Sequence, residues 1–207
     1  MSTEFKQRTL DKGITYKQYI DDWSSYLDET DPNELNESEK IFFDYRRLNF
    51  QRSSRIQKTY SIDAETASFL DKIQEPQVWM VLTENWCGDS AQSLPYLAAI
   101  AETSDKIELR ILYRDENIDI MDNYLTNGKS RSIPKLVSFD SEGNELFQWG
   151  PRPKLAQQFL EDELQKGKDK QSVYQDLHLW YNRDKGKTIE SEIVNLLETV
   201  TNNQPGQ

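Results

Sequence analysis

An apolar stretch that leads directly to the only cysteine constrains this 207-residue chain more than any other feature. Residues 78–82, VWMVL, have the length and composition of a buried strand. After a short turn, Cys87 opens a segment that has the pattern of a helix. The sequence therefore predicts a strand, a turn and a helix, with a thiol at the N-terminus of the helix.

A thiol in that position has an expected chemistry. Unpaired backbone N–H groups and the positive end of the macrodipole favour an anion there, and so favour the thiolate over the thiol. The thiolate is the form that attacks disulfides and peroxides. The carboxylate of Asp89 opposes this effect by repulsion. On balance we expect the pKa of Cys87 to lie below its ordinary value, so that the thiol is partly ionised at neutral pH.

Two motifs make this chain similar to the thioredoxin family. The first is WCGDS at residues 86–90, a Cys-x-x-Ser segment that follows a buried strand, with Pro95 eight positions beyond the cysteine. The second is Ile133-Pro134, which leads into KLVSF at residues 135–139 and a glycine-containing turn at residues 142–145. In the family, the proline of this second motif has a cis peptide bond and opens a strand.

The resemblance covers residues 62–164, about half of the chain. It implies an α/β protein with a three-layer α/β/α thioredoxin-like fold, in which a mixed central sheet has helices on both sides. Helical spacing of apolar residues on either side of this region predicts added N- and C-terminal helices. We therefore expect an N-terminal helical extension over residues 1–60, a thioredoxin-like domain over 61–165 and a C-terminal helical extension over 166–207.

The N-terminal extension has a loose start and two capping boxes. Residues 1–13 are polar, and we expect no fixed structure there. Thr15 with Gln18, and Asn36 with Glu39, each match a capping box ahead of a helix. The second helix has an apolar side made of Ile41, Phe42, Tyr45 and Leu48. These faces are too small for a separate core, so the extensions should dock on the thioredoxin-like unit or on a second copy, forming a homodimer.

The C-terminal extension has the same helical spacing. Apolar residues fall on one face at Val173, Leu177, Trp180 and Tyr181, and a further helix follows the Lys185-Gly186 pair. Residues 201–207 are expected to be a frayed tail.

The charge balance limits the partners. The chain has 25 basic and 36 acidic residues, a net charge of −11, so we expect neither nucleic acid nor an anionic membrane as a partner. One segment is locally basic, with Arg46, Arg47, Arg52, Arg55 and Lys58. Aromatic residues between these charges allow a nucleic-acid surface, but a solvated helix face explains them better.

The compartment is inferred from signals that the sequence lacks. The first residues contain no apolar stretch of a secretory signal, and no segment approaches the length of a membrane span. A single unpaired cysteine fits a reducing compartment. We therefore expect a cytoplasmic protein.

The resemblance implies a monothiol chemistry. In dithiol members of the family, the first cysteine attacks a substrate disulfide and the second resolves the mixed disulfide. The second cysteine is Ser90 here, and Val81 stands where many thioredoxins have a buried acid that assists the resolving cysteine. Cys87 and Ser90 are thus the expected catalytic residues, with Ser90 donating a hydrogen bond to the thiolate. A mixed disulfide at Cys87 with a protein or glutathione would be released by an external thiol.

A substrate-binding groove is implied on the same grounds. If Pro134 is cis, the backbone before it lies beside Cys87 and can pair with an extended substrate chain. The expected substrate-binding residues are Trp86, Gly88, Asp89, Ser132, Ile133 and Pro134. Trp86 has a second interpretation, packing against the loop. Arg131 either supplies a positive charge to the substrate or is a surface arginine.

Other chemistries lack their residues. Cys87 and the single histidine, His178, do not make a metal site, and no glycine-rich phosphate loop is present. A peroxiredoxin-like Thr-x-x-Cys is absent, since Glu84 stands three residues before the cysteine. A tyrosine-phosphatase-like loop would need an arginine where Ser93 stands. We expect no metal or other cofactor, with glutathione as the only candidate co-substrate.

Two hypotheses remain. In the first, the protein is a monothiol thiol-disulfide oxidoreductase. In the second, it is a catalytically inactive thioredoxin-like module, in which the groove beside Cys87 binds an extended peptide and the thiol has no role.

Overall fold

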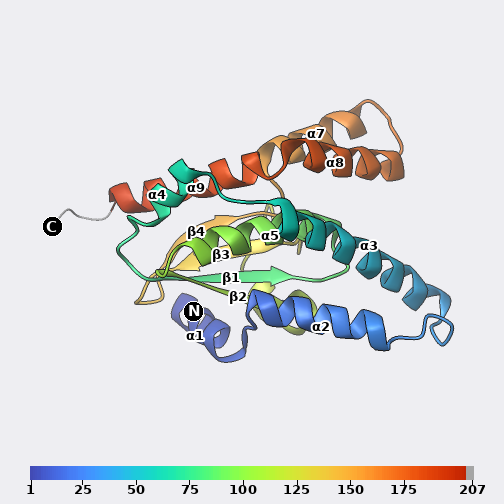
Figure 1. Cartoon of the computed structure of the whole chain (residues 1–207), viewed down its shortest axis with the longest axis horizontal. Coiled ribbons are helices and arrows are strands. Elements are labelled where there is room, and N and C mark those ends of the chain that lie inside the picture. Colours follow the sequence, from blue (N-terminus) through green and yellow to red (C-terminus); the bar gives the residue numbers. More distant parts are fainter. Residues whose placement is uncertain (204–207) are drawn as a thin grey trace. The chain divides into compact units, whose positions relative to one another are not determined.

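The computed structural model describes residues 1–203 (Figure 1). The chain forms two compact units, one from Met1 to Pro151 and one from Arg152 onward, and each is described by itself. The boundaries at residues 60 and 165 remain predictions. None of the helices in residues 1–203 has the length and the apolar composition of a membrane-spanning segment.

The first unit contains a mixed four-stranded sheet in the order β2-β1-β3-β4. Its strands are β1 (Gln77–Thr83), β2 (Ile107–Tyr113), β3 (Lys135–Phe139) and β4 (Glu145–Trp149). Strand β1 runs parallel to β2 and antiparallel to β3, and β4 is antiparallel to β3. Every residue of β1 is buried, as its continuous apolar sequence predicts for an interior strand.

Helices lie on both faces of this sheet, which confirms the predicted α/β/α architecture (Figure 1). They are α1 (Ser2–Lys12), α2 (Tyr16–Glu29), α3 (Glu37–Thr59), α4 (Ala64–Leu70), α5 (Gly88–Thr103) and α6 (Ile118–Met121), with a 3-10 turn, η1 (Arg114–Glu116), after β2. Alternate β1 residues point to opposite faces. Met80 and Leu82 join a core cluster that includes Phe5 of α1 and Ile120 of α6. Helix α5 covers the other face, and α3 packs against α5.

The expectation that residues 1–13 are loose is wrong. Residues 2–12 form helix α1, whose Phe5 and Thr9 are buried. Phe5 packs edge-on against Tyr124 with ring centroids 6.1 Å apart. Phe5 in the sheet core, together with an ion pair of 2.7 Å between Arg8 and Asp119, thus orders a segment that is mostly polar, so tertiary contacts outweigh local sequence preference.

Both predicted capping boxes are present, but the buried side of α3 differs from the apolar side expected for it. The four residues of that apolar side, Ile41, Phe42, Tyr45 and Leu48, are between 43% and 56% exposed. The buried face of α3 instead consists of Phe43, Asn49, Ser53 and Ile56. Its polar members hydrogen-bond to backbone carbonyls of the adjoining segments: Asn49 to Asn85 (3.4 Å) and Ser53 to Ala91 (3.1 Å).

The second unit is helical. It contains α7 (Lys154–Gln165), α8 (Lys170–Asp184) and α9 (Lys187–Asn203). Its buried cluster consists of Ala156, Leu160, Val173, Leu177 and Tyr181. The backbone N–H of Lys154 donates to the carboxylate of Glu192 at 2.7 Å, which ties the start of α7 to α9. The predicted tail at residues 201–207 is helical as far as Asn203, and residues 204–207 lie outside the described part.

Candidate functional site

Cys87 is the N-cap residue of α5, as the sequence predicts. Strand β1 ends at Thr83, and the loop that follows is closed by a hydrogen bond of 3.1 Å from the Cys87 N–H to the Glu84 carbonyl. The carbonyl of Cys87 then accepts from Ala91, which is the first hydrogen bond of the helix. The end of an interior strand thus places a half-buried thiol at the N-terminus of α5.

The second motif lies beside this thiol. The Cys87 sulfur donates to the Ile133 carbonyl oxygen at 3.4 Å, and the Ile133–Pro134 peptide bond is cis. Gly150 packs against the same segment, because a Cβ atom at this position would lie 2.2 Å from the Pro134 carbonyl oxygen. Its φ of +108° also favours glycine. The glycine that follows β4 therefore allows the backbone approach that keeps Pro134 close to the sheet.

The expectation of a lowered Cys87 pKa is wrong. Burial is the largest effect and raises the pKa of Cys87, and repulsion by the Asp89 carboxylate raises it further. Hydrogen bonds from the Ser90 hydroxyl and from the N–H groups of Ser90 and Asp89 lower it, but by less. The helix N-terminus does favour the thiolate, yet the loss of solvation outweighs it.

Ser90 is placed to act on the thiolate. Its side chain is 1% exposed, and its hydroxyl has no hydrogen-bond partner of regular geometry among the described residues. The hydroxyl is therefore available as a donor when Cys87 becomes charged, which agrees with its effect in lowering the pKa of Cys87.

The other predicted site residues lie in the first turn of α5 and in the segment that ends at Pro134. Gly88 and Asp89 form the first turn of α5 next to Cys87. Ile133, whose carbonyl accepts from the Cys87 sulfur, and Pro134 are both buried. Ser132 is half-buried and its hydroxyl lies 2.7 Å from that of Ser130. The site roles given to these residues remain predictions.

Trp86 packs against two neighbours. Its ring meets that of Phe42 edge-on at 5.8 Å, and the guanidinium of Arg114 lies over it at 5.0 Å. Packing against the loop is therefore the interpretation that the contacts favour.

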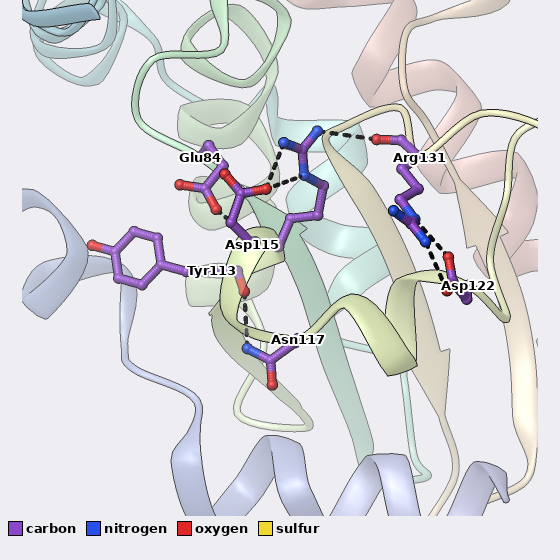
Figure 2. Close-up of polar contacts among 7 residues, drawn as sticks. Glu84, Tyr113, Asp115, Asn117, Asp122 and Arg131 are labelled. Carbon is purple, nitrogen blue, oxygen red and sulfur yellow. Dashed lines mark hydrogen bonds and ion pairs between the residues drawn. The ribbon is translucent and has the colours of Figure 1, made fainter. Parts of the chain in front are cut away.

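Arg131 is committed to an ion pair. Its guanidinium donates to both carboxylate oxygens of Asp122, at 2.6 and 2.9 Å (Figure 2). This pairing lowers the pKa of Asp122 and raises that of Arg131. The surface interpretation fits this arginine better than a substrate contact.

A polar network behind the Cys87 loop was not predicted. Glu84 is buried and its carboxylate accepts from the Asp115 N–H at 2.9 Å (Figure 2). Burial is the largest effect on this carboxyl group and raises its pKa. Arg114 pairs with Asp115 and donates to the Arg131 carbonyl at 3.2 Å, in the loop before Pro134. The network therefore connects the ends of β1 and β2 to the segment that faces the thiol.

The register of the parallel strands β1 and β2 explains why the residues of this network meet. Thr83 and Tyr113 are partners in the β1–β2 pair, so the residues that follow them leave the sheet at the same edge. An acid after one strand and an Arg-Asp pair after the other are therefore expected to meet.

Helix α3 supports the same loop from the other side. The Arg46 guanidinium donates to the Asn85 side chain at 2.7 Å, while Asn49 donates to the Asn85 backbone. The loop before Cys87 is thus held by contacts from residues that lie far away in the sequence.

Comparisons with solved structures show the fold. A protein of unknown function from Pseudomonas aeruginosa is 17% identical, with a TM-score of 0.56 over 91% of this chain and 94% of that chain. An HIV epitope-scaffold is 16% identical, with a TM-score of 0.58 over 93% of this chain and 97% of that chain. No curated protein matches the chain.

A family model described as thioredoxin matches residues 36–166. The match includes both motifs, the four strands and helix α3, and it spans more than half of the 207 residues. The chain therefore belongs to the thioredoxin-like superfamily.

Proposed function

We propose that this protein carries out monothiol thiol–disulfide exchange at Cys87. The Cys87 thiolate attacks one sulfur of a substrate disulfide, forming a Cys87 mixed disulfide and releasing the other half of the substrate as a thiolate. An external thiol such as glutathione, as its thiolate, then attacks the mixed disulfide. A new disulfide leaves and the Cys87 thiolate is restored, so no net oxidation of the protein occurs.

The contact between Cys87 and Ile133 is the observation that carries this proposal. The sulfur lies 3.4 Å from the Ile133 carbonyl oxygen, at the N-terminus of α5 and beside a cis proline. An extended substrate that pairs with the backbone before Pro134 would bring its disulfide to this sulfur. Protein disulfides and glutathione disulfides are the proposed substrates.

Ser90 and the first turn of α5 would stabilise the thiolate of Cys87 although the sulfur is buried. The Ser90 hydroxyl and two backbone N–H groups stabilise the charged sulfur. Ser90 cannot form a disulfide with Cys87, and Cys87 is the only cysteine of the chain. Release of the mixed disulfide therefore depends on a thiol from outside the chain.

The raised pKa of Cys87 supports a second candidate function, a peptide-binding module without catalysis. A thiol that is mostly protonated at neutral pH reacts slowly with disulfides. In this alternative, the backbone before Pro134 still pairs with an extended chain, and the thiol fills space beside it.

A turnover assay separates the two functions. Hydroxyethyl disulfide is supplied with reduced glutathione, and the formation of oxidised glutathione is followed with the wild type and with Cys87→Ser. Exchange chemistry predicts turnover by the wild type and none by Cys87→Ser above the uncatalysed rate. Equal rates for the two proteins would leave the binding module as the function.

A further inference from the structure

A pocket of about 810 Å³ lies beside the Cys87 loop in the first unit. It is formed by the facing parts of α2 and α3, by Trp86, and by Arg114 and Asp115 after β2. Its volume is in the range of roughly 300 to 1,000 Å³ that small-molecule sites have. Trp86 lines the pocket and directly precedes Cys87 in the chain, while Cys87 itself does not line the pocket.

The pocket combines aromatic rings with guanidinium groups. The Arg46 guanidinium lies 4.9 Å from the Tyr26 ring centroid, and that of Arg114 lies 5.0 Å from the Trp86 ring centroid. An arginine stacked on a ring keeps the donors at its edge available, and these match the two oxygens of a carboxylate. The donors of Arg114 are used by Asp115 and by the Arg131 carbonyl, so within residues 1–203 the available guanidinium donor of the lining is Nη2 of Arg46.

Arg46 forms no ion pair with another residue of the described part of the chain. It is half-buried and donates only to neutral oxygens, those of the Asn85 side chain (2.7 Å) and the Tyr26 hydroxyl (3.4 Å). Within residues 1–203, no carboxylate lies at ion-pair distance from Arg46, and its Nη2 atom has no hydrogen-bond partner. A partly buried guanidinium is stabilised when a carboxylate accepts its hydrogen bonds. A ligand carboxylate would supply that acceptor.

The acidic residues of the pocket are already engaged. Asp115 forms an ion pair with Arg114 at 2.6 Å. Glu39 accepts from the Asn36 N–H at 2.9 Å in the capping box of α3. The charge of Arg46 lowers the pKa of Glu84, but the Glu84 carboxylate accepts its hydrogen bond from the Asp115 N–H and does not line the pocket. These carboxylates therefore accept their hydrogen bonds from groups other than Arg46.

We propose that this pocket binds the carboxylate of a low-molecular-weight thiol or disulfide, with Arg46 as its main partner and the sulfur directed toward Cys87. The inference rests on the proposed function and extends it, since it identifies an acidic small thiol as the substrate class. The site is separate from the backbone before Pro134 and is formed largely by α2 and α3. Arg114 connects the two, because it lines the pocket and donates to the Arg131 carbonyl in the loop before Pro134.

Binding is tested without chemistry at sulfur. S-methylglutathione has two carboxylates and no exchangeable sulfur, and its affinity for the full chain is measured by calorimetry. Arg46→Gln should weaken binding about tenfold or more, because a charge-assisted hydrogen bond is lost. Arg47→Gln is the matched control, since Arg47 is on the same helix, pairs with Asp44 at 2.8 Å and does not line the pocket. It should change the affinity less than about twofold, as expected for an exposed ion pair.

A second variant keeps the test decisive if Arg46→Gln does not fold. Arg46→Lys retains the charge but cannot bind a carboxylate with two parallel hydrogen bonds, so its affinity should fall severalfold. Circular dichroism establishes that each variant is folded. The inference is overturned if the wild type does not bind S-methylglutathione, or if folded Arg46 variants bind it as tightly as the wild type does.

A reactivity comparison distinguishes this inference from the proposed function. Oxidised glutathione has carboxylates and hydroxyethyl disulfide has none, and both are reacted with Cys87. Arg46→Gln should slow the reaction with oxidised glutathione about tenfold more than it slows the reaction with hydroxyethyl disulfide. If wild-type Cys87 reacts with neither disulfide, the proposed function is wrong, and calorimetry still shows whether the pocket binds S-methylglutathione. Equal slowing of both reactions, or of neither, would contradict a carboxylate site at Arg46.

Discussion

The sulfur of Cys87 lies 3.4 Å from the carbonyl oxygen of Ile133, a residue 46 positions further along the chain. This contact joins the N-terminus of α5 to the start of β3, and both motifs of the thioredoxin-like fold meet in it. Burial and the Asp89 carboxylate oppose ionisation of this thiol, whereas hydrogen bonds from Ser90 and from the Asp89 N–H favour it, so the reactivity of Cys87 depends on the balance between them.

The pH dependence of Cys87 alkylation should reflect this balance. Because burial and Asp89 raise the pKa of Cys87, the rate with iodoacetamide should continue to rise above the pH at which an ordinary thiol is half ionised. Asp89→Asn removes the repulsion, lowers the pKa and should raise the rate at pH 7 about threefold to tenfold. An unchanged profile in Asp89→Asn would show that the carboxylate does not act on the sulfur.

Ser90→Ala should have the opposite effect. It removes the hydroxyl that stabilises the thiolate, so the pKa of Cys87 rises. The lost hydrogen bond is worth about 1 kcal/mol, so alkylation at pH 7 should slow severalfold. Stopped-flow alkylation measures the change. The backbone N–H groups of residues 89 and 90 remain in this variant, so the thiol stays reactive at high pH. A rate equal to that of the wild type at every pH would exclude Ser90 from the site chemistry.

The sheet and the local structure of the two motifs can be predicted from the sequence, because each depends on a short segment of the chain. The apolar stretch of β1, the Cys87 helix start and the Ile133-Pro134 motif each occupy a few consecutive residues. The buried side of α3 was not predictable in this way, since Asn49 and Ser53 are buried to hydrogen-bond to distant carbonyls. The spacing of apolar residues identifies helix faces that are buried through hydrophobic contacts, whereas the buried face of α3 is partly polar.

The Cys87 pKa was mispredicted for a related reason. The helix N-terminus is visible in the sequence, but the burial of the thiol depends on segments that pack against it. Ile133, whose carbonyl accepts from the Cys87 sulfur, is 46 positions away. Desolvation is a property of the assembled site, so the direction of the shift requires the structure.

Gly150→Ala should destabilise the first unit strongly. The new Cβ atom would lie 2.2 Å from the Pro134 carbonyl oxygen, at a φ of +108° that an alanine rarely adopts. We expect a loss of about 2 to 4 kcal/mol in the free energy of unfolding, measured by urea denaturation. Gly128→Ala is the control, because its φ is +67° and no atom lies within 4 Å of the new Cβ. It should lose only about 1 to 2 kcal/mol; similar losses in both variants would argue against a close approach at Gly150.

Phe5→Ala tests the docking of α1. Phe5 is 6% exposed in the core cluster and packs against Tyr124, so its removal should cost about 3 to 5 kcal/mol in the free energy of unfolding. Tyr45→Ala, at a side chain that is 54% exposed on α3, should cost less than about 0.5 kcal/mol. Urea denaturation of both variants gives the comparison. A small loss in Phe5→Ala would mean that residues 2–12 are not held against the sheet.

The most direct measurement is the intact mass of the protein after reaction with oxidised glutathione, followed by addition of reduced glutathione. Monothiol exchange predicts one glutathione adduct, located at Cys87 by peptide mapping, absent from Cys87→Ser and removed by reduced glutathione. An unmodified wild-type protein, or an adduct that reduced glutathione does not release, would contradict the proposed chemistry.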